Sequence, residues 1–458
     1  MIGRRLAPPP IAGAAIDAAR IPFGLTPRAL GFLAAGLVWM VPAWIDRRAL
    51  LLMVLWDVFI AALIVLNGRR LPRPSDLLVT RDWRAPLSLG SETPVAIDVR
   101  NGSGARIQIK VSDYVSPAVH RDLVDGTLTV PGGSAASLSY VVSPRERGDA
   151  TMGVVSLEWR DDWGLVTRWG IAPLEQTVRV YPDLREGRRQ ALYLIRSRQI
   201  ALEKRRARRF GVSREFDSLR DYRPGDERRD VAWAVSARRG KLVTKLYQPE
   251  RSQSIWLIVD AGRLLRARSG PHTLLDATIS SALALAQVAI ASGDRVGLLA
   301  YGRRIQHRIA PARGAGHVRT LAEALATVRA DGVEADHAGA AAAFLASQKR
   351  RALVVWLTEV AETAGVPDVI EHTLRLTASH VLLFAVARQP EIETLAAATP
   401  ATASGMYRVM SAQETLARRE TLLHGLGQRG AMVLEVAPAD LSSGLVDRYL
   451  EVKERGLL

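Results

Sequence analysis

Two apolar runs separated by only three residues constrain this chain more than any other feature. The first, Ala29 to Ile45, carries no charge, and the second, Ala49 to Leu66, carries only Asp57. Each run is near the minimum length of a helix that spans a bilayer. The connector is residues 46–48 (DRR). Two buried core helices would need a very short turn here, whereas a membrane hairpin needs only such a polar cap. We therefore expect a transmembrane helical hairpin over residues 29–66.

A cleaved signal peptide is the alternative for the first run. It fits poorly, because the run begins late, lacks a small-residue cleavage pattern and is followed at once by a second run. An ionised carboxylate is costly in the middle of a membrane, so Asp57 should be protonated or face the other helix. A tolerated acid that contacts a Trp or the backbone is favoured over a proton relay.

The arginines around the two runs predict their direction in the membrane. Those before the first run, after the second run and in the connector are, in that order, Arg4, Arg5, Arg20 and Arg28; Arg69, Arg70 and Arg73; Arg47 and Arg48. By the positive-inside rule, both ends of the hairpin face the cytoplasm. Residues 1–28 are then a cytoplasmic N-terminal tail, and the soluble domains after the hairpin face the cytoplasm too.

Composition limits the remaining possibilities. With 458 residues, 48% of them hydrophobic, the chain can form two or three domains besides its membrane segments. Its formal net charge of +16 favours an anionic neighbour, which could be lipid headgroups, nucleic acid or an acidic protein. Because the chain has no cysteine, disulfides, thiolate nucleophiles and cysteine-ligated metals are excluded.

Residues 75–182 follow the segment LPRPSD and alternate apolar with polar residues. The alternation is clearest at 95–99, 107–111, 154–159 and 178–181, and the turn sequences NGSG and PGGS occur in the same region. A period of two with such turns predicts antiparallel strands, which bury a face by packing two sheets together. We expect a small antiparallel β-sandwich here.

Residues 183–253 begin with the strongest basic segment of the chain. Residues 184–210 contain ten Lys or Arg and two Glu on a helical pattern. A solvated helix face and an electrostatic contact with anionic lipid explain this charge about equally well. Nucleic acid is not expected as a partner, because neither interleaved aromatic residues nor a DNA-reading module accompanies the charge.

From residue 254 to 458, apolar runs typical of buried strands alternate with helical segments. The runs are SIWLIVDAG, DRVGLLAYG, ALVVWLTEV, HVLLFAVA and AMVLEVAP, with helices expected at 273–291, 317–330 and 413–426 and another between the third and fourth runs. This alternation predicts an α/β domain with a parallel, doubly wound sheet covered on both faces.

Two acids follow strands of this sheet, Asp260 after the first and Glu359 after the sequence WLT. Ligands of such sheets bind beyond the carboxyl ends of the strands. The arrangement resembles the von Willebrand factor A domain, whose adhesion site holds Mg²⁺ with Asp-x-Ser-x-Ser, a Thr and a later Asp. Here the first motif is Asp260-Ala-Gly-Arg-Leu, without either hydroxyl, and Glu359 stands where Asp is usual. Magnesium needs oxygen ligands that Gly and Leu side chains do not supply. We favour strand-end acids that cap the following helices, with no cofactor, over a degenerate metal site.

Residues 214–251 carry a second and more specific resemblance. They are similar to the signature of the bacterial domain-of-unknown-function family 58, which contains Glu-Phe, Leu-Arg-x-Tyr-x-x-Gly-Asp, Arg, Trp and Ser-Ala-Arg. The matching residues are Glu215, Phe216, Leu219, Arg220, Tyr222, Gly225, Asp226, Arg229, Trp233, Ser236, Ala237, Arg238 and Glu250. The resemblance extends to the order of hairpin, β region with DDWGL at 161–165, signature and A-type domain. It implies a bacterial inner-membrane protein.

The signature places Arg beside Asp and Glu around two aromatic residues, Tyr222 and Trp233. One interpretation is a structural ion-pair network, anchored by the aromatics, that docks this segment on the A-type sheet. The other is a surface that recognises a partner. The family resemblance implies such a partner, because these proteins are typically encoded with MoxR-type AAA+ ATPases.

No motif in the sequence predicts an enzyme. Residues 425–430 spell G-x-G-x-x-G, but they follow a helix and precede a strand, the reverse of a dinucleotide-binding unit. P-loop, G-x-S-x-G and H-E-x-x-H motifs are absent. We expect a membrane-tethered, non-enzymatic adaptor with a chaperone-like or cell-envelope-related role. The alternatives are a Mg²⁺-dependent ligand binder that uses Asp260 and Glu359, and an unrecognised hydrolase in which Asp226 would be the residue to test.

Overall fold

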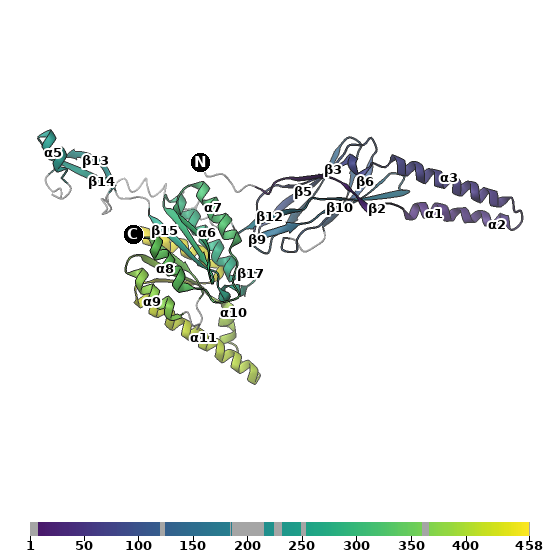
Figure 1. Ribbon diagram of the computed structural model, residues 1–458. Coiled ribbons are helices and arrows are strands. Elements are labelled where there is room, and N and C mark those ends of the chain that lie inside the picture. Colours follow the sequence, from purple (N-terminus) through teal and green to yellow (C-terminus); the bar gives the residue numbers. More distant parts are fainter. Residues whose placement is uncertain are drawn as a thin grey trace. The chain divides into compact units, whose positions relative to one another are not determined.

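The chain has a multidomain layout of mixed helices and sheets. The computed structural model describes residues 8–119, 124–183, 185, 215–223, 231–248, 253–359 and 366–457. The basic segment, residues 184–210, lies outside this part except for Arg185. The chain divides into two compact units, residues 5–183 and residues 184–458 with residues 1–4 (Figure 1). Each unit is described by itself.

The strands of the first unit form three sheets, and their buried side chains gather in two apolar clusters. Their orders are β1-β3-β5-β8, β2-β11-β10-β6-β7 and β4-β12-β9. The bounds are β1 (Ala12–Ala15), β2 (Asp17–Leu25), β3 (Leu77–Trp83), β4 (Leu87–Ser88), β5 (Thr93–Asn101), β6 (Ile107–Asp113), β7 (Val124–Val130), β8 (Ala135–Val142), β9 (Gly148–Met152), β10 (Val155–Asp161), β11 (Val166–Ala172) and β12 (Gln176–Tyr181). Alternate residues of β3, β6 and β10 are buried, as the period of two predicts.

The main core of this unit lies between the first two sheets. Val79 and Ile97 from one sheet share an apolar cluster with Ile109 and Trp159 from the other. A buried ion pair joins the two layers as well, because Arg81 on β3 pairs with Asp113 at the end of β6. The first two sheets therefore pack face to face as two layers.

The N-terminal residues differ from the expected tail. Strand β1 pairs with β3 and β2 pairs with β11, so each extends one sheet of the sandwich. Ile16, between them, is 4% exposed in the core. The sequence signal is weak here because small residues such as Ala and Gly dominate, and strand pairing supplies what local propensity does not. The helical hairpin is thus an insertion between two strands of the sandwich.

Two antiparallel apolar helical segments leave one end of these sheets side by side (Figure 1). The first is continuous through α1 (Pro27–Ala35), the 3₁₀ segment η1 (Gly36–Trp39) and α2 (Met40–Ala43), and the second is α3 (Ala49–Arg70). Gly36 makes the close approach possible, since a Cβ there would lie 2.6 Å from a carboxylate oxygen of Asp57. Asp57 therefore faces the other helix, as expected. Of the 18 consecutive residues of α3 with the highest hydropathy, only 6% are buried, in contrast to a core helix.

The second unit contains a six-stranded sheet in the order β19-β18-β15-β20-β21-β22, in which only β19 is antiparallel to its neighbour. The strands are β15 (Ser254–Asp260), β18 (Arg295–Tyr301), β19 (Ile305–Ala312), β20 (Leu353–Leu357), β21 (Val381–Ala387) and β22 (Met432–Val436). Strands β15, β18, β20 and β21 are buried almost throughout, as a sheet covered on both faces requires.

The helices of this unit are α6 (Leu274–Ala291), α7 (Ala315–Thr327), α8 (His337–Ser347), α9 (Val366–Thr377), α10 (Pro390–Ala396), α11 (Ala403–Gln428) and α12 (Leu441–Arg455). Helix α6 is also apolar enough to cross a membrane, but its apolar window is 72% buried, so it is a core helix. Helices α8, α10 and α12 and the edge strand β19 were not expected from the sequence. Helix α11 is longer than expected because Thr402 caps its N-terminus and accepts a hydrogen bond from Gly405 N–H.

The signature segment forms a hairpin, β13 (Glu215–Asp221) and β14 (Val243–Gln248), with the short helix α5 (Trp233–Arg239) in its connection. Helix α5 ends at Gly240, whose φ of +66° is the left-handed conformation that glycine adopts without strain. Ser236 Oγ accepts a hydrogen bond from Val243 N–H at 2.9 Å and so ties the helix to β14.

Candidate functional site

Asp260 and Glu359 lie at the switch point of the six-stranded sheet. Strand β15 is central. The next strands in sequence, β18 and β19, lie on one side of it, and the later strands, β20 to β22, lie on the other side. Asp260 is the last residue of β15, and Thr358 and Glu359 directly follow β20. Because ligands of doubly wound sheets bind where the strand order reverses, this edge is the first candidate site.

The carboxylate of Asp260 is buried and already hydrogen-bonded. Its Oδ1 accepts from Gly262 N–H at 2.6 Å, and its Oδ2 accepts from the Thr358 hydroxyl, also at 2.6 Å. Burial raises the pKa of Asp260 above its ordinary value, against the opposing effects of His337 and of these hydrogen bonds. The acid thus bonds across the two strand ends instead of capping a helix.

Glu359 is balanced by an arginine from a distant helix. Arg419 on α11 places Nη1 2.9 Å from Oε1 of Glu359 and Nε 3.0 Å from Oε1 of Glu435 on β22. Its Nη2 also donates to the carbonyl of Ala387, at the end of β21, at 2.7 Å. Glu359 and Arg419 are both nearly inaccessible to solvent. One guanidinium therefore joins the ends of three neighbouring strands.

Next to Asp260, a chain of hydrogen bonds connects three aromatic rings. The indole N–H of Trp356 donates to the hydroxyl of Tyr301 at 2.7 Å, and that hydroxyl lies 2.8 Å from Nδ1 of His337. Burial, and then the charge of Asp260, raise the pKa of Tyr301 well above its ordinary value. Tyr301 therefore stays neutral and accepts the Trp356 hydrogen bond, and these rings extend the polar edge of the sheet into the core.

The residues at this edge do not fit a magnesium ion. A Cβ on Gly262 would lie 3.0 Å from the backbone nitrogen of Ala335, so the loop before α8 closes directly over the strand end. Both Asp260 oxygens accept protein hydrogen bonds, and the Arg419 guanidinium pairs with Glu359 where a dication would be expected. Among the described residues, no three His, Asp or Glu side chains converge in a metal-binding cluster. The arrangement is a closed polar junction.

The signature residues provide a second candidate surface. Trp233 is 64% exposed at the start of α5, Arg238 is exposed in its last turn, and Tyr222 is half-buried and bonds through its N–H to Leu242. An exposed ion pair joins Lys241 to Asp221 at 2.9 Å. Among the described residues of the signature, Trp233 is therefore exposed to solvent.

Only some of the remaining signature residues lie in the part of the chain that the structure describes. Arg220 lies on β13 and is half-buried, and Glu215 begins that strand, paired in register with Gln248. Gly225, Asp226 and Arg229 lie outside the described residues. The expected grouping of Asp226 and Arg229 with Tyr222 thus stays a prediction.

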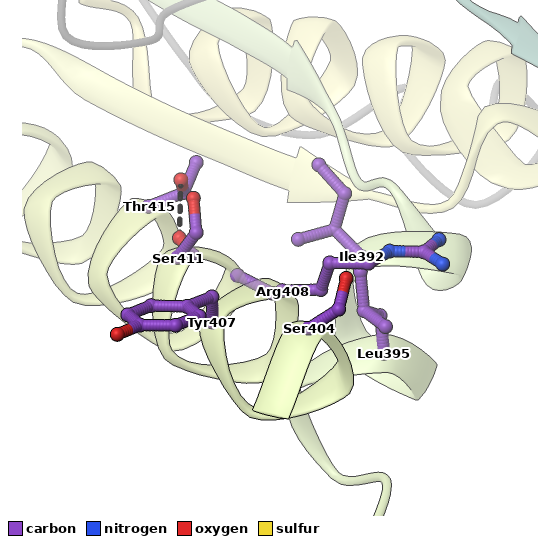
Figure 2. Close-up of a pocket in the computed structure, with 8 residues that line it drawn as sticks. Ile392, Leu395, Ser404, Tyr407, Arg408, Ser411 and Thr415 are labelled. Atoms are coloured by element: carbon purple, nitrogen blue, oxygen red, sulfur yellow. Dashed lines mark hydrogen bonds between the residues drawn. The ribbon is translucent and has the colours of Figure 1, made fainter. Parts of the chain in front are cut away.

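A shallow groove between α10 and α11 is a third feature of the surface. It has a volume of about 660 Å³. Figure 2 shows Ile392 and Leu395 from α10 and, from α11, Tyr407 and Arg408 around it. Tyr407 is 75% exposed, so the groove is open to solvent. This groove was not expected from the sequence, because α10 was not predicted.

The family comparison matches the signature and much of the α/β unit. Residues 218–400 match the family described as "Protein of unknown function DUF58". This confirms the resemblance that the signature residues indicated. Among curated proteins, the chain is 29% identical over 134 residues to the uncharacterized protein YeaD of Bacillus subtilis, with 27% of this chain and 31% of that protein covered.

A second relative is the uncharacterized protein Rv1480 of Mycobacterium tuberculosis. It is 27% identical over 151 residues, with 32% of this chain and 48% of the relative covered. The matches thus span about a third to a half of the length of these relatives.

Solved structures match individual parts of the chain. The conserved hypothetical protein BatB from Bacteroides thetaiotaomicron is 11% identical, covering 45% of this chain and all of that one, with a TM-score of 0.30. A CARDB domain from Pyrococcus furiosus, solved with di-metal ions, is 14% identical, covering 22% and 87%, with a TM-score of 0.15.

Proposed function

We propose that this chain, whose residues 218–400 match the DUF58 family, is a membrane-tethered, non-enzymatic adaptor that docks a protein partner through its signature segment. The exposed Trp233 carries this proposal. A tryptophan is mostly buried in folded proteins, and exposed Trp and Arg side chains are the residues that dominate binding energy at protein interfaces. Trp233 is 64% exposed and shares α5 with the exposed Arg238 and Arg239.

The chemistry of this surface indicates an acidic partner surface. Its exposed cations would steer and complement carboxylates around the indole ring. The family resemblance implies that the partner is a MoxR-type AAA+ ATPase, which would supply the nucleotide chemistry. In this proposal the α/β unit is a von Willebrand A-like domain. Its strand order and the acids at its switch point support that assignment, and its closed edge supports a role other than metal-dependent binding.

The tether is the pair of apolar helical segments. The exposed apolar surface of α3 supports a lipid environment, and the flanking arginines support an orientation with the soluble units in the cytoplasm. The family resemblance implies that this membrane is the bacterial inner membrane. A single cysteine can be placed at will in a chain that has none. In intact cells, an impermeant maleimide should label Arg47→Cys in the connector and spare Tyr114→Cys on the sandwich. The reverse pattern would overturn the orientation.

The partner is tested by affinity capture of the full-length chain from a detergent extract, with and without ATP. We expect a MoxR-type AAA+ ATPase to be recovered. Trp233→Ala should lower the recovery by about tenfold or more, as for an interface hot spot of ~2 kcal/mol. Tyr407→Ala, in the α10–α11 groove, is the matched control and should leave recovery unchanged. Repeated capture without any AAA+ ATPase would count against the proposal.

A further inference from the structure

Both apolar helical segments are anchored to one turn of the sandwich, residues 161–166. On the first segment, Thr26 caps α1, and its hydroxyl donates to the carbonyl of Gly164 at 2.6 Å. Its N–H donates to Leu165 at 3.1 Å. On the second, Asn67 near the end of α3 donates to Oδ2 of Asp161 at 2.5 Å and accepts from Val166 N–H at 3.0 Å. Thr26 and Asn67 are both buried.

The turn itself is firmly built. Oδ1 of Asp161 accepts from the N–H groups of Trp163 and Gly164, each at 3.1 Å, and Gly164 has a φ of +61°. Such a side-chain-closed turn with a left-handed glycine has little freedom to rearrange. Arg168 on β11 donates to the carbonyl of Gly68 at 2.8 Å and so adds a further bond to the end of α3. We call Thr26, Asn67, residues 161–166 and the two arginines that contact this turn, Arg28 and Arg70, the root.

The surface of the root is aromatic and basic. Trp163 is 40% exposed, and the guanidinium of Arg70 lies 4.8 Å from the centre of its ring. A Cβ on Gly164 would lie 3.4 Å from Nη1 of Arg28, so a second arginine, from the other helical segment, contacts the same turn. Arg69, next to Arg70 in sequence, is exposed on the last turn of α3, and Asp162 is the exposed acid of the turn. Cations therefore outnumber acids here.

The position of the root along α3 fixes its depth if that helix spans a bilayer. The apolar part of α3 ends at Leu66, and Arg70 follows after four residues, about 6 Å at a helical rise of 1.5 Å. The headgroup region of a leaflet is of similar thickness. Tryptophan concentrates at this level, and arginine there is attracted to anionic lipids.

We propose that the root binds the phosphate headgroups of anionic lipids, with Trp163 at the membrane interface and Arg28 and Arg70 on the phosphates. The proposal rests on the membrane tether of the proposed function. Because each segment bonds to the same turn, the sandwich is held directly against the bilayer in one orientation. The connection between the sandwich and the membrane segments is therefore rigid and not a flexible linker.

The depth of the root is measured with spin labels in the cysteine-free chain, purified whole and reconstituted in nanodiscs. Trp163→Cys tests the root, Tyr114→Cys reports the opposite end of strand β6, and Val58→Cys reports the exposed face of α3. Accessibility to oxygen and to an aqueous nickel chelate should place the label at 163 in the headgroup region, that at 114 in water and that at 58 in hydrocarbon. A label at 163 as water-accessible as that at 114 would overturn the proposal, whereas an aqueous label at 58 would overturn the tether itself.

Headgroup selectivity is measured with spin-labelled lipids and the same nanodiscs. We expect spin-labelled phosphatidylglycerol to be motionally restricted by the chain in excess of spin-labelled phosphatidylcholine. The double variant Arg28→Gln/Arg70→Gln should abolish the excess. The matched control Arg84→Gln/Arg145→Gln removes the same charge from exposed positions away from the root and should keep it. Equal restriction of both lipids by the unmodified chain would overturn the assignment of anionic headgroups.

Discussion

Arg419 and Glu359, sixty residues apart in sequence, form a buried ion pair at 2.9 Å that closes the carboxyl edge of the α/β sheet. The same guanidinium lies 3.0 Å from Glu435 and donates to the carbonyl of Ala387, so it compensates two acids and one strand end. A buried charge without its partner is strongly destabilising, while a pair removed together can be replaced at little cost. The ion pair therefore has a structural role, because it holds the carboxyl ends of neighbouring strands together.

Removal of Arg419 alone should destabilise this edge of the sheet. Arg419→Met removes the buried guanidinium that pairs with Glu359, and we expect a loss of about 3–5 kcal/mol in the local stability of the α/β unit. The double variant Arg419→Met/Glu359→Gln should recover much of this loss. Hydrogen–deuterium exchange of peptides from β20 and β21 gives the measurement, with peptides of the sandwich as the internal control. Equal losses of stability in the single and double variants would contradict this structural role of the ion pair.

Asp260 should make the α/β unit less stable as pH rises. Burial raises its pKa in the folded state, so the folded chain binds the proton more tightly than the unfolded chain does. The stabilisation is complete below the ordinary pKa of an Asp and is lost as pH rises through the raised value. Asp260→Asn cannot titrate. The stability of the variant relative to the unmodified chain should therefore increase from acidic to neutral pH, as measured by exchange of β15 amides over that range. A constant difference would refute this sign.

Magnesium should not bind at this edge. The hydrogen bonds to Asp260 and the guanidinium beside Glu359 occupy the positions that oxygen-coordinated Mg²⁺ would need. Calorimetric titration of the full chain in detergent with Mg²⁺ should give only the heat of dilution, and the same result with Asp260→Ala. Uptake of Mg²⁺ that disappears in Asp260→Ala would instead restore the metal-dependent ligand binder.

The two acids of this edge, Asp260 and Glu359, could be located from the sequence, but Arg419, the cation that pairs with Glu359, could not. The strand pattern places Asp260 and Glu359 together, because both follow strands of one parallel sheet. Arg419 carries no such signal, since its role depends on how α11 packs across the strand ends. The same limit explains β1 and β2, which are strands through pairing with β3 and β11 and not through their own composition. Local pattern predicts elements, whereas long-range pairing decides which charges meet.

The sandwich depends on a second buried ion pair, between Arg81 and Asp113. Arg81 also donates to the carbonyl of Leu174 at 2.8 Å and to that of Gly153 at 3.0 Å, and the Tyr140 hydroxyl donates to Asp113. Arg81→Met should destabilise the sandwich by about 3–5 kcal/mol, because Asp113 is left buried. Tyr140→Phe should cost less, about 1.5–3 kcal/mol, for one hydrogen bond to a charged group. Exchange rates of β3 and β6 amides measure both, and a larger loss in Tyr140→Phe would reverse this ranking.

The pairing of the two apolar segments can be tested by a disulfide in the cysteine-free chain. Gly36 and Asp57 face each other so closely that a Cβ on Gly36 would lie 2.6 Å from the Asp57 carboxylate. Gly36→Cys/Asp57→Cys should cross-link on mild oxidation in native membranes, since disulfides need Cβ atoms about 3.5–4.5 Å apart. Gly31→Cys/Asp57→Cys is the matched control, because a Cβ at position 31 meets nothing within 4 Å, and it should stay reduced. Non-reducing electrophoresis after proteolysis in the connector gives the readout. Cross-linking of the control pair alone would mean a different register between the helices, and with it a different position for Asp57.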